Sequence, residues 1–207
     1  MAYQRMGSKL RNTVRTVSNV SGSVVRFQKI GTGSASTKSR NGLVTPMELA
    51  HTNVEATLED HYAAEYIDKL DEMKTNIDER QAVAKSAAAA LGRTTDEILY
   101  TAMDAGANST QIHEFASSDF VGEQNLPYAG GMSMKEFLGF KIFSTSAITA
   151  GKNMAYHTSS VGLGISADVS TELNYVPERV AHLATSMMSM GAKVIDDNGV
   201  YEVLDNN

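Results

Sequence analysis

The chain has no cysteine among its 207 residues and no tryptophan. Without cysteine it can form neither disulfides nor thiolate metal sites, which is in keeping with synthesis in a reducing cytoplasm. No apolar run approaches the roughly 20 residues that a membrane-spanning helix needs. The polar N-terminus also lacks the apolar core of a secretory signal. The sequence therefore predicts no membrane partner.

Acidic residues are absent from the first 47 positions, which carry eight basic residues. The other 160 positions carry 24 acidic and ten basic residues, so the whole chain has a net charge of −6. A basic segment ahead of an acidic body is typical of an arm that binds nucleic acid or an acidic protein surface. We call residues 1–47 the basic front; its charged residues are Arg5, Lys9, Arg11, Arg15, Arg26, Lys29, Lys38 and Arg40.

Residues 55–79, which we call the acidic strip, hold nine acidic and only two basic residues. If the front of one copy contacts the strip of another, every copy carries both halves of a contact that builds rings or shells. The nearly equal and opposite charges favour this hypothesis. The candidate contact residues of the strip are Glu55, Glu59, Asp60, Glu65, Asp68, Asp71 and Glu72.

The alternative is a nucleic-acid-binding protein that uses the basic front as its arm. Eight cations on one flexible segment support it. Against it, Tyr3 and Phe27 are the only aromatic residues of the front, which leaves little surface for base stacking. The negative charge of the whole chain also opposes accumulation on DNA.

Motifs that carry catalytic chemistry are not found. The five histidines show no metal-binding pair at helical spacing, and no nucleophile-elbow pattern occurs. The glycine-rich stretch that begins at Gly31 lacks both the third glycine and the strand-to-helix context of a dinucleotide site. We predict a protein that is not an enzyme and has no metal site and no cofactor.

The front half is expected to hold an extended polar arm over residues 1–20 and then a long hairpin. Alternation over residues 24–30 predicts a strand, residues 31–42 a flexible basic tip, and residues 43–45 and then 53–58 the returning strand. Such a hairpin buries little on its own and needs a partner.

Two helices are expected next. The first is capped by Asn76, spans residues 81–91 and ends at Gly92; the second starts at the Thr94 cap and ends at Gly106. Strands are expected at 137–144, 154–157 and 173–176. A short helix beginning at Pro177 should give way to a strand near Ser186. Residues 194–195 and 200–204 should pair around an Asn-Gly turn. The fold class predicted is α+β.

Short motifs, in this order, resemble major capsid proteins of tailed bacteriophages. They are EYIDKLDE at 65–72, NIDERQ at 76–81, AALGR at 89–93, FASSDFVG at 115–122, FLG at 137–139, VPER at 176–179, MMSMGA at 187–192, ID at 195–196 and GV at 199–200.

The resemblance implies the Hong Kong ninety-seven capsid fold. Its parts would be an N-terminal arm (1–20), an extended loop hairpin (21–60), a peripheral domain with a long spine helix beginning near residue 77 (61–110), an axial domain portion (111–167) and the C-terminal strands of the peripheral domain (168–207). Near Asn108 to Thr110 the chain is shorter than this fold leads us to expect, so its axial domain is either reduced or incompletely represented in this chain.

The same resemblance implies a self-assembling protein that forms the hexamers and pentamers of an icosahedral head. The implied partners are other copies, portal and scaffolding proteins, decoration proteins, and packaged double-stranded DNA bound without sequence specificity.

Overall fold

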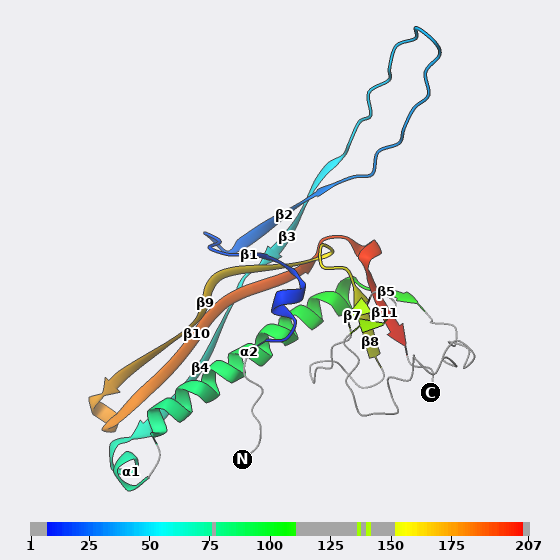
Figure 1. The fold of residues 1–207 in the computed structure, drawn as a ribbon. Helices are drawn as coiled ribbons and strands as arrows, with labels where there is room; N and C mark the ends of the chain where they lie inside the picture. The colour runs from blue at the N-terminus through cyan, green and yellow to red at the C-terminus, as the bar shows by residue number, and fades with distance from the viewer. Residues whose placement is uncertain (1–7, 76–77, 111–135, 138–139, 142–151, 205–207) are drawn as a thin grey trace, which may run out of the picture.

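The structure is a computed structural model that describes residues 8–75, 78–110, 136–137, 140–141 and 152–204. One long helix lies along a four-stranded sheet, and a two-stranded hairpin projects from one end of that sheet (Figure 1). Helix and strand segments are mixed along the chain, so the α+β class is confirmed.

The main sheet has the strand order β1 (Arg15–Val17), β9 (Val161–Val176), β10 (Ala181–Val194) and β4 (Glu59–Asp68). Strand β10 is antiparallel to both neighbours, whereas β1 is parallel to β9. Pairing of β9 with β10 is irregular between Met187 and Met190, where the register shifts. The expected domain boundary at 167/168 falls inside β9, so residues on both sides of it pair with the same strand.

Helix α2 (Glu79–Gly106) is continuous over 28 residues, so the predicted break at Gly92 is wrong. The Thr94 and Thr95 hydroxyls donate to the carbonyls of Ala90 and Leu91 within the helix, and Thr94 caps nothing. Gly92 is buried. Burial of this helix face against the sheet outweighs the roughly 1 kcal/mol that an interior glycine costs.

The start of α2 also differs from the prediction. Asp78 is the N-cap, and its Oδ1 accepts a hydrogen bond from the Gln81 amide at 3.2 Å. Asn76, the expected cap, lies outside the described residues.

The core lies between α2 and the sheet. Leu91, Leu99 and Met103 of the helix pack with buried residues of β9 and β10: Val161, Leu163, Ile165, Met188, Met190 and Val194. Val161, Leu163 and Ile165 alternate along β9, and this pattern fixes which face of the strand meets α2.

The predicted hairpin is confirmed as β2 (Val24–Ile30) and β3 (His51–Thr57), paired antiparallel with Phe27 opposite Val54. Residues 31–50 form its tip and contain no strand, so the returning strand expected at residues 43–45 is wrong and pairing begins only at His51. Leu58 is the single residue between β3 and β4. Near the body, Val25, Phe27 and Ala56 pack with Ile195 in a second hydrophobic cluster.

The first 20 residues are not simply an extended arm. Residues 8–17, which we call the N-terminal segment, contain the short helix η1 (Arg11–Thr13) and β1. Leu10 and Val14 are buried in the main core. The apolar pair Leu10 and Val14, four residues apart, was the sequence signal for this packing.

A smaller sheet contains β5 (Asn108–Thr110), β11 (Val200–Leu204) and β8 (Lys152–Tyr156), in that order. The expected hairpin between residues 194–195 and 200–204 is therefore wrong. The turn η4 (Asp197–Gly199) sends the chain from the main sheet into the smaller one.

The remaining elements are short. Helix α1 (Lys69–Lys74) follows β4. Strand β6 (Glu136–Phe137) pairs with β7 (Phe140–Lys141), and the two overlap the segment predicted as one strand at 137–144; the rest of that segment lies outside the described residues. The predicted helix after Pro177 is only the turn η3 (Pro177–Arg179), and β10 begins at Ala181 rather than near Ser186. Strands at 154–157 and 173–176 are found as parts of β8 and β9.

Candidate assembly surfaces

The N-terminal segment is fastened to α2 by one buried carboxylate. Asp96 is 6% exposed. It accepts hydrogen bonds from the amides of Lys9 and Leu10, each at 3.1 Å, and from the Ser8 hydroxyl. A buried carboxylate is tolerated only when donors surround it. Sequence reasoning did not single out Asp96, because one acid on an amphipathic helix gives no local signal of burial.

Arg11 lies beside Asp168 of the same chain. Its two terminal nitrogens donate to the two carboxylate oxygens at 2.8 and 2.6 Å. This hydrogen-bonded pairing raises the pKa of Arg11 and holds the pKa of Asp168 below its usual value. Arg11, predicted to contact a neighbouring copy, thus has a carboxylate partner within its own chain, bound through two hydrogen bonds.

Two more cations of the basic front pair internally. Arg26 Nε lies 2.7 Å from Glu55 Oε1 across the hairpin. Two residues that were predicted to contact a neighbouring copy therefore pair with each other within one chain. Lys29 Nζ lies 2.8 Å from Asp196 Oδ1, and this hydrogen bond lowers the pKa of Asp196. The second pair ties the hairpin to the sheet.

The remaining basic residues are spread over the segment and the hairpin. Lys38 and Arg40 are exposed in the tip, where the Lys38 amine donates to the Gly42 carbonyl at 3.2 Å. Lys9 and Arg15 are exposed in the N-terminal segment. Arg5 lies outside the described residues.

The tip also exposes large apolar side chains. Leu43 is 96% exposed and Val44 69%, and Met47 and Leu49 are exposed as well. Figure 1 shows the tip extending away from the rest of the subunit. Apolar side chains gathered on such a projection mark a contact site for another molecule.

The acidic strip does not form one cluster; it runs from the end of β3 through the edge strand β4 and α1 to the start of α2. On β4, Ile67 is buried and Ala63 packs against the core, so these residues face α2. Side chains therefore alternate, and the opposite face, which we call the outer face, presents Asp60, Tyr62, Ala64, Tyr66 and Asp68, all exposed.

Register extends the apolar part of the outer face onto β10. Leu183 lies opposite Tyr66 and Met187 opposite Tyr62, and both β10 residues are only half-buried. Arg179 stacks over the Tyr66 ring with its guanidinium carbon 4.5 Å from the ring centroid. The outer face is thus an apolar ribbon with carboxylates at Asp60 and Asp68.

The other predicted acidic residues have local roles. Asp68 also caps α1 by accepting from the Leu70 amide at 2.7 Å, and Asp71 lies 3.1 Å from the Lys74 amine. Glu72 lies 2.6 Å from Arg80 Nε and raises the pKa of that arginine, which links α1 to α2. Glu59 and Glu65 are exposed on the same face of β4 as Ile67.

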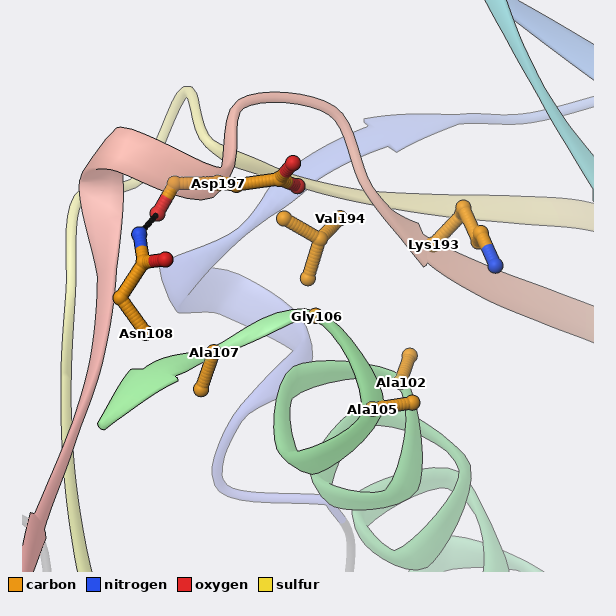
Figure 2. Close-up of a pocket in the computed structure, with 8 residues that line it drawn as sticks. All are labelled: Ala102, Ala105, Gly106, Ala107, Asn108, Lys193, Val194 and Asp197. Atoms are coloured by element: carbon orange, nitrogen blue, oxygen red, sulfur yellow. Dashed lines mark hydrogen bonds between the residues drawn. The ribbon is translucent and has the colours of Figure 1, made fainter.

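The end of α2 meets the smaller sheet around a shallow cavity of about 290 Å³ (Figure 2). Its lining is dominated by small side chains, and the Asn108 amide donates to the Asp197 carbonyl at 2.6 Å. Figure 2 shows the Lys193 amine pointing away from the other lining residues. Nearby, Lys152 lies 2.8 Å from both Asp104 and Glu202, which raise its pKa and join the smaller sheet to the helix.

Among the residues that the structure describes, no three histidine or acidic side chains gather where they could hold a metal ion. Within the same residues, no helix combines the length and the apolar character needed to cross a membrane.

Comparison with known proteins gives one family. The family model described as "Phage capsid protein" matches residues 1–113 and 110–206, two stretches that overlap at residues 110–113, beside the position where the chain is shorter than the Hong Kong ninety-seven fold leads us to expect. No curated protein matches the sequence.

Solved phage structures, two of them described as capsids, share the fold at low sequence identity. The capsid structure of cyanophage P-SCSP1u aligns with a TM-score of 0.72 and 12% identity, covering 100% of this chain and 90% of that chain. A structure from Mycobacterium phage Bobi gives 0.71 and 14%, covering 100% and 93%. The mature capsid of bacteriophage PhiM1 gives 0.67 and 11%, covering 98% and 88%.

These matches confirm the expected Hong Kong ninety-seven type of fold and the resemblance to tailed-phage capsid proteins. They agree with a structural component of a virion rather than an enzyme. Because the family model spans nearly the whole sequence, the chain belongs to the phage capsid protein family.

Proposed function

We propose that this chain is a major capsid protein that self-assembles into the hexamers and pentamers of an icosahedral phage head around double-stranded DNA. The observation that carries the proposal is the hairpin tip. It extends from the subunit with Leu43 and Val44 more than two-thirds exposed, at a cost in apolar hydration that a partner surface would remove.

The partner surface that fits the tip best is the outer face of a neighbouring copy. The tip offers apolar side chains together with Lys38 and Arg40, and the outer face offers Tyr62 and Tyr66 between carboxylates. Apolar contact supplies the affinity, and opposite charge fixes the register and excludes wrong partners. Every copy carries both halves, so the contact is heterologous and propagates into closed rings.

Charge pairing within the subunit narrows the predicted contact set. Arg11, Arg26 and Lys29 already have intrachain carboxylate partners. Of the other five basic residues, Lys38 and Arg40 lie in the projecting tip and are therefore the cations best placed for a neighbour. The same pairing weakens the nucleic-acid-binding alternative, because three of the eight basic residues already pair with carboxylates of the same chain and are less available to bind phosphates.

The rest of the proposal concerns the whole particle. We place the axial domain within residues 111–167, expect portal, scaffolding and decoration proteins as further partners, and assign no catalytic reaction to the chain. Synthesis would take place in the host cytoplasm. The DNA inside would meet the protein without base-specific contacts.

Sedimentation velocity and electron microscopy of the purified protein test the proposal. We expect capsomers and shells; a monomer or dimer under all assembly conditions would show the proposal to be wrong. The variant Lys38→Glu with Arg40→Glu should block assembly while the subunit stays folded. The control Lys85→Glu with Arg93→Glu makes the same charge change on exposed positions of α2 and should still assemble. Normal shells with lost DNA affinity in the tip variant would instead favour the nucleic-acid hypothesis.

A further inference from the structure

Three glycines lie where the base of the hairpin meets the sheet. Gly164 of β9 and Gly191 of β10 are register partners, and Gly162 lies two residues before Gly164. Residues Val161, Leu163 and Ile165 face α2, so the glycines lie on the opposite face of the sheet, under the hairpin.

The hairpin packs against these three glycines so closely that no side chain would fit between them. A Cβ atom on Gly162 would come within 3 Å of the Phe27 ring, one on Gly164 within 3 Å of the Val25 side chain, and one on Gly191 within 3 Å of the Thr57 carbonyl oxygen. Phe27 is 1% exposed and Val25 is 4% exposed, so these side chains at the base of the hairpin are buried. The backbone of the sheet itself is the surface on which the hairpin rests.

The two strands of the hairpin rest on different glycines. Gly162 and Gly164 lie under β2, because their neighbours Phe27 and Val25 belong to that strand, whereas Gly191 lies under the end of β3 at Thr57. A methyl group added under one strand would raise that side alone. Methyl groups under the two strands should therefore tilt the hairpin in opposite directions.

Other links also join the hairpin to the body: Val25, Phe27 and Ala56 contact Ile195 in the second hydrophobic cluster, and the Val20 amide, just before β2, donates to the Ile165 carbonyl at 3.1 Å. Leu58 alone joins β3 to β4, and its amide donates to the Ser23 carbonyl at 2.9 Å. The Lys29 to Asp196 ion pair adds a half-exposed contact, which contributes about 0–1 kcal/mol. The glycine contacts differ from these links because they lie directly between each hairpin strand and the backbone of the sheet, so they constrain the angle at which the hairpin leaves the sheet.

We propose that Gly162, Gly164 and Gly191 form a seat that sets the hairpin angle and so determines where the tip of one copy reaches its neighbour. These glycines are positioning residues: they act through the hairpin and touch no partner themselves. The effect on shells rests on the proposed function, whereas the effect on the angle is a property of the single subunit.

The angle can be measured in the unassembled subunit by pulsed electron paramagnetic resonance. Since the chain has no cysteine, Ser39→Cys in the tip with Ala64→Cys on β4 gives one pair of spin labels, and Ser39→Cys with Ser170→Cys on β9 gives a second. A tilt toward one edge of the sheet shortens one distance and lengthens the other.

We expect Gly162→Ala and Gly191→Ala to shift these distances in opposite senses. Phe27→Leu, which shortens the side chain above Gly162, should reverse the shift in Gly162→Ala. It should not reverse the shift in Gly191→Ala, because that clash involves backbone. Phe27→Leu alone is the control and should leave both distances near the wild-type values.

Wild-type distances in folded Gly162→Ala and Gly191→Ala subunits would overturn the proposal. If Gly191→Ala does not fold, Gly162→Ala with and without Phe27→Leu decides the question, because its clash involves only the end of a side chain. Electron microscopy of the same variants should show shells of altered diameter or none. Failure of the wild-type protein to form shells would count against the proposed function and leave the angle measurement standing.

Discussion

A carboxylate that is shut away from water needs hydrogen-bond donors, and Asp96 finds three of them on the N-terminal segment. Ser8, Lys9 and Leu10 surround it, while Leu10 and Val14 fill the adjacent core. Polar and apolar anchoring thus coincide within seven residues. At the scale of residues, this segment belongs to the folded body.

Replacing Asp96 by alanine should destabilise the subunit by about 1–3 kcal/mol, because the donors of residues 8–10 would lose their acceptor. Urea unfolding followed by circular dichroism measures the change. Glu97→Ala, at the next position but exposed, is the matched control and should cost less than about 0.5 kcal/mol. Equal effects of the two substitutions would contradict the anchoring role.

Acid should weaken the Arg11 to Asp168 pair. Arg11 lowers the pKa of Asp168 below its ordinary value of 3.8, so the pair stabilises the fold above that pH. The contribution is lost as the pH falls through the lowered pKa of the folded state. The two side chains are 32% and 57% exposed, so we expect about 0–1 kcal/mol at neutral pH.

The measurement is the difference in unfolding free energy between the wild type and Arg11→Gln across the acid range. We expect this difference to shrink towards zero below the ordinary carboxyl pKa. Arg93→Gln, exposed on α2, should show no such trend. A difference that persists unchanged in strong acid would mean that Arg11 acts through packing instead.

At the scale of elements, local residue patterns predicted the strands and helices whose formation depends on neighbouring residues in the sequence. Alternation from Val24 to Ile30 placed β2, and the Ala-rich run placed the first half of α2. The predictions that were wrong concern features that depend on residues distant in the sequence. Gly92 does not end a helix, because packing on the sheet stabilises α2 beyond it. Asn198-Gly199 does not form a hairpin, because β11 pairs with β8 and β5 instead of with β10.

The start of α2 offers a test at this scale. Asp78→Ala removes the acceptor of the Gln81 amide and should destabilise the subunit by about 0.5–2 kcal/mol. Asp78→Ser keeps a capping oxygen and should retain most of the stability. Thermal denaturation of the two variants distinguishes them; equal losses would show that the Asp78 side chain acts other than as a cap.

For the whole molecule, the sequence predicted the presence of a hairpin and a charged front but not their geometry. Counting charges could not show that Arg26 faces Glu55, or that Asp60 and Asp68 lie with Tyr62 on the outer face. Those facts follow from strand register, and register is decided by which face is buried. The packing of the hairpin on the three glycines could not be predicted from the sequence either, because Gly164 and Gly191 become neighbours only in the sheet.

Shortening the hairpin should separate folding from assembly. Gly31 and Ala50 are already joined by a backbone hydrogen bond of 2.7 Å, so residues 32–49 can be replaced by Asn-Gly. We expect the unfolding free energy to change by less than about 1 kcal/mol, since a shorter loop costs little to close. Electron microscopy should show no shells. Shells of normal size would rule out the tip as the assembly contact.

The direct passage from β3 through Leu58 into β4 also has a mechanical consequence. A pull on the hairpin acts along β4, whose ten residues are each paired with β10 between Ala181 and Met190. Tension directed along a strand strains all the rungs of its ladder together, whereas a force across the strand would open them one after another. A load that arrives from a neighbouring subunit is thus shared along the full length of β4, and the subunit resists it in shear.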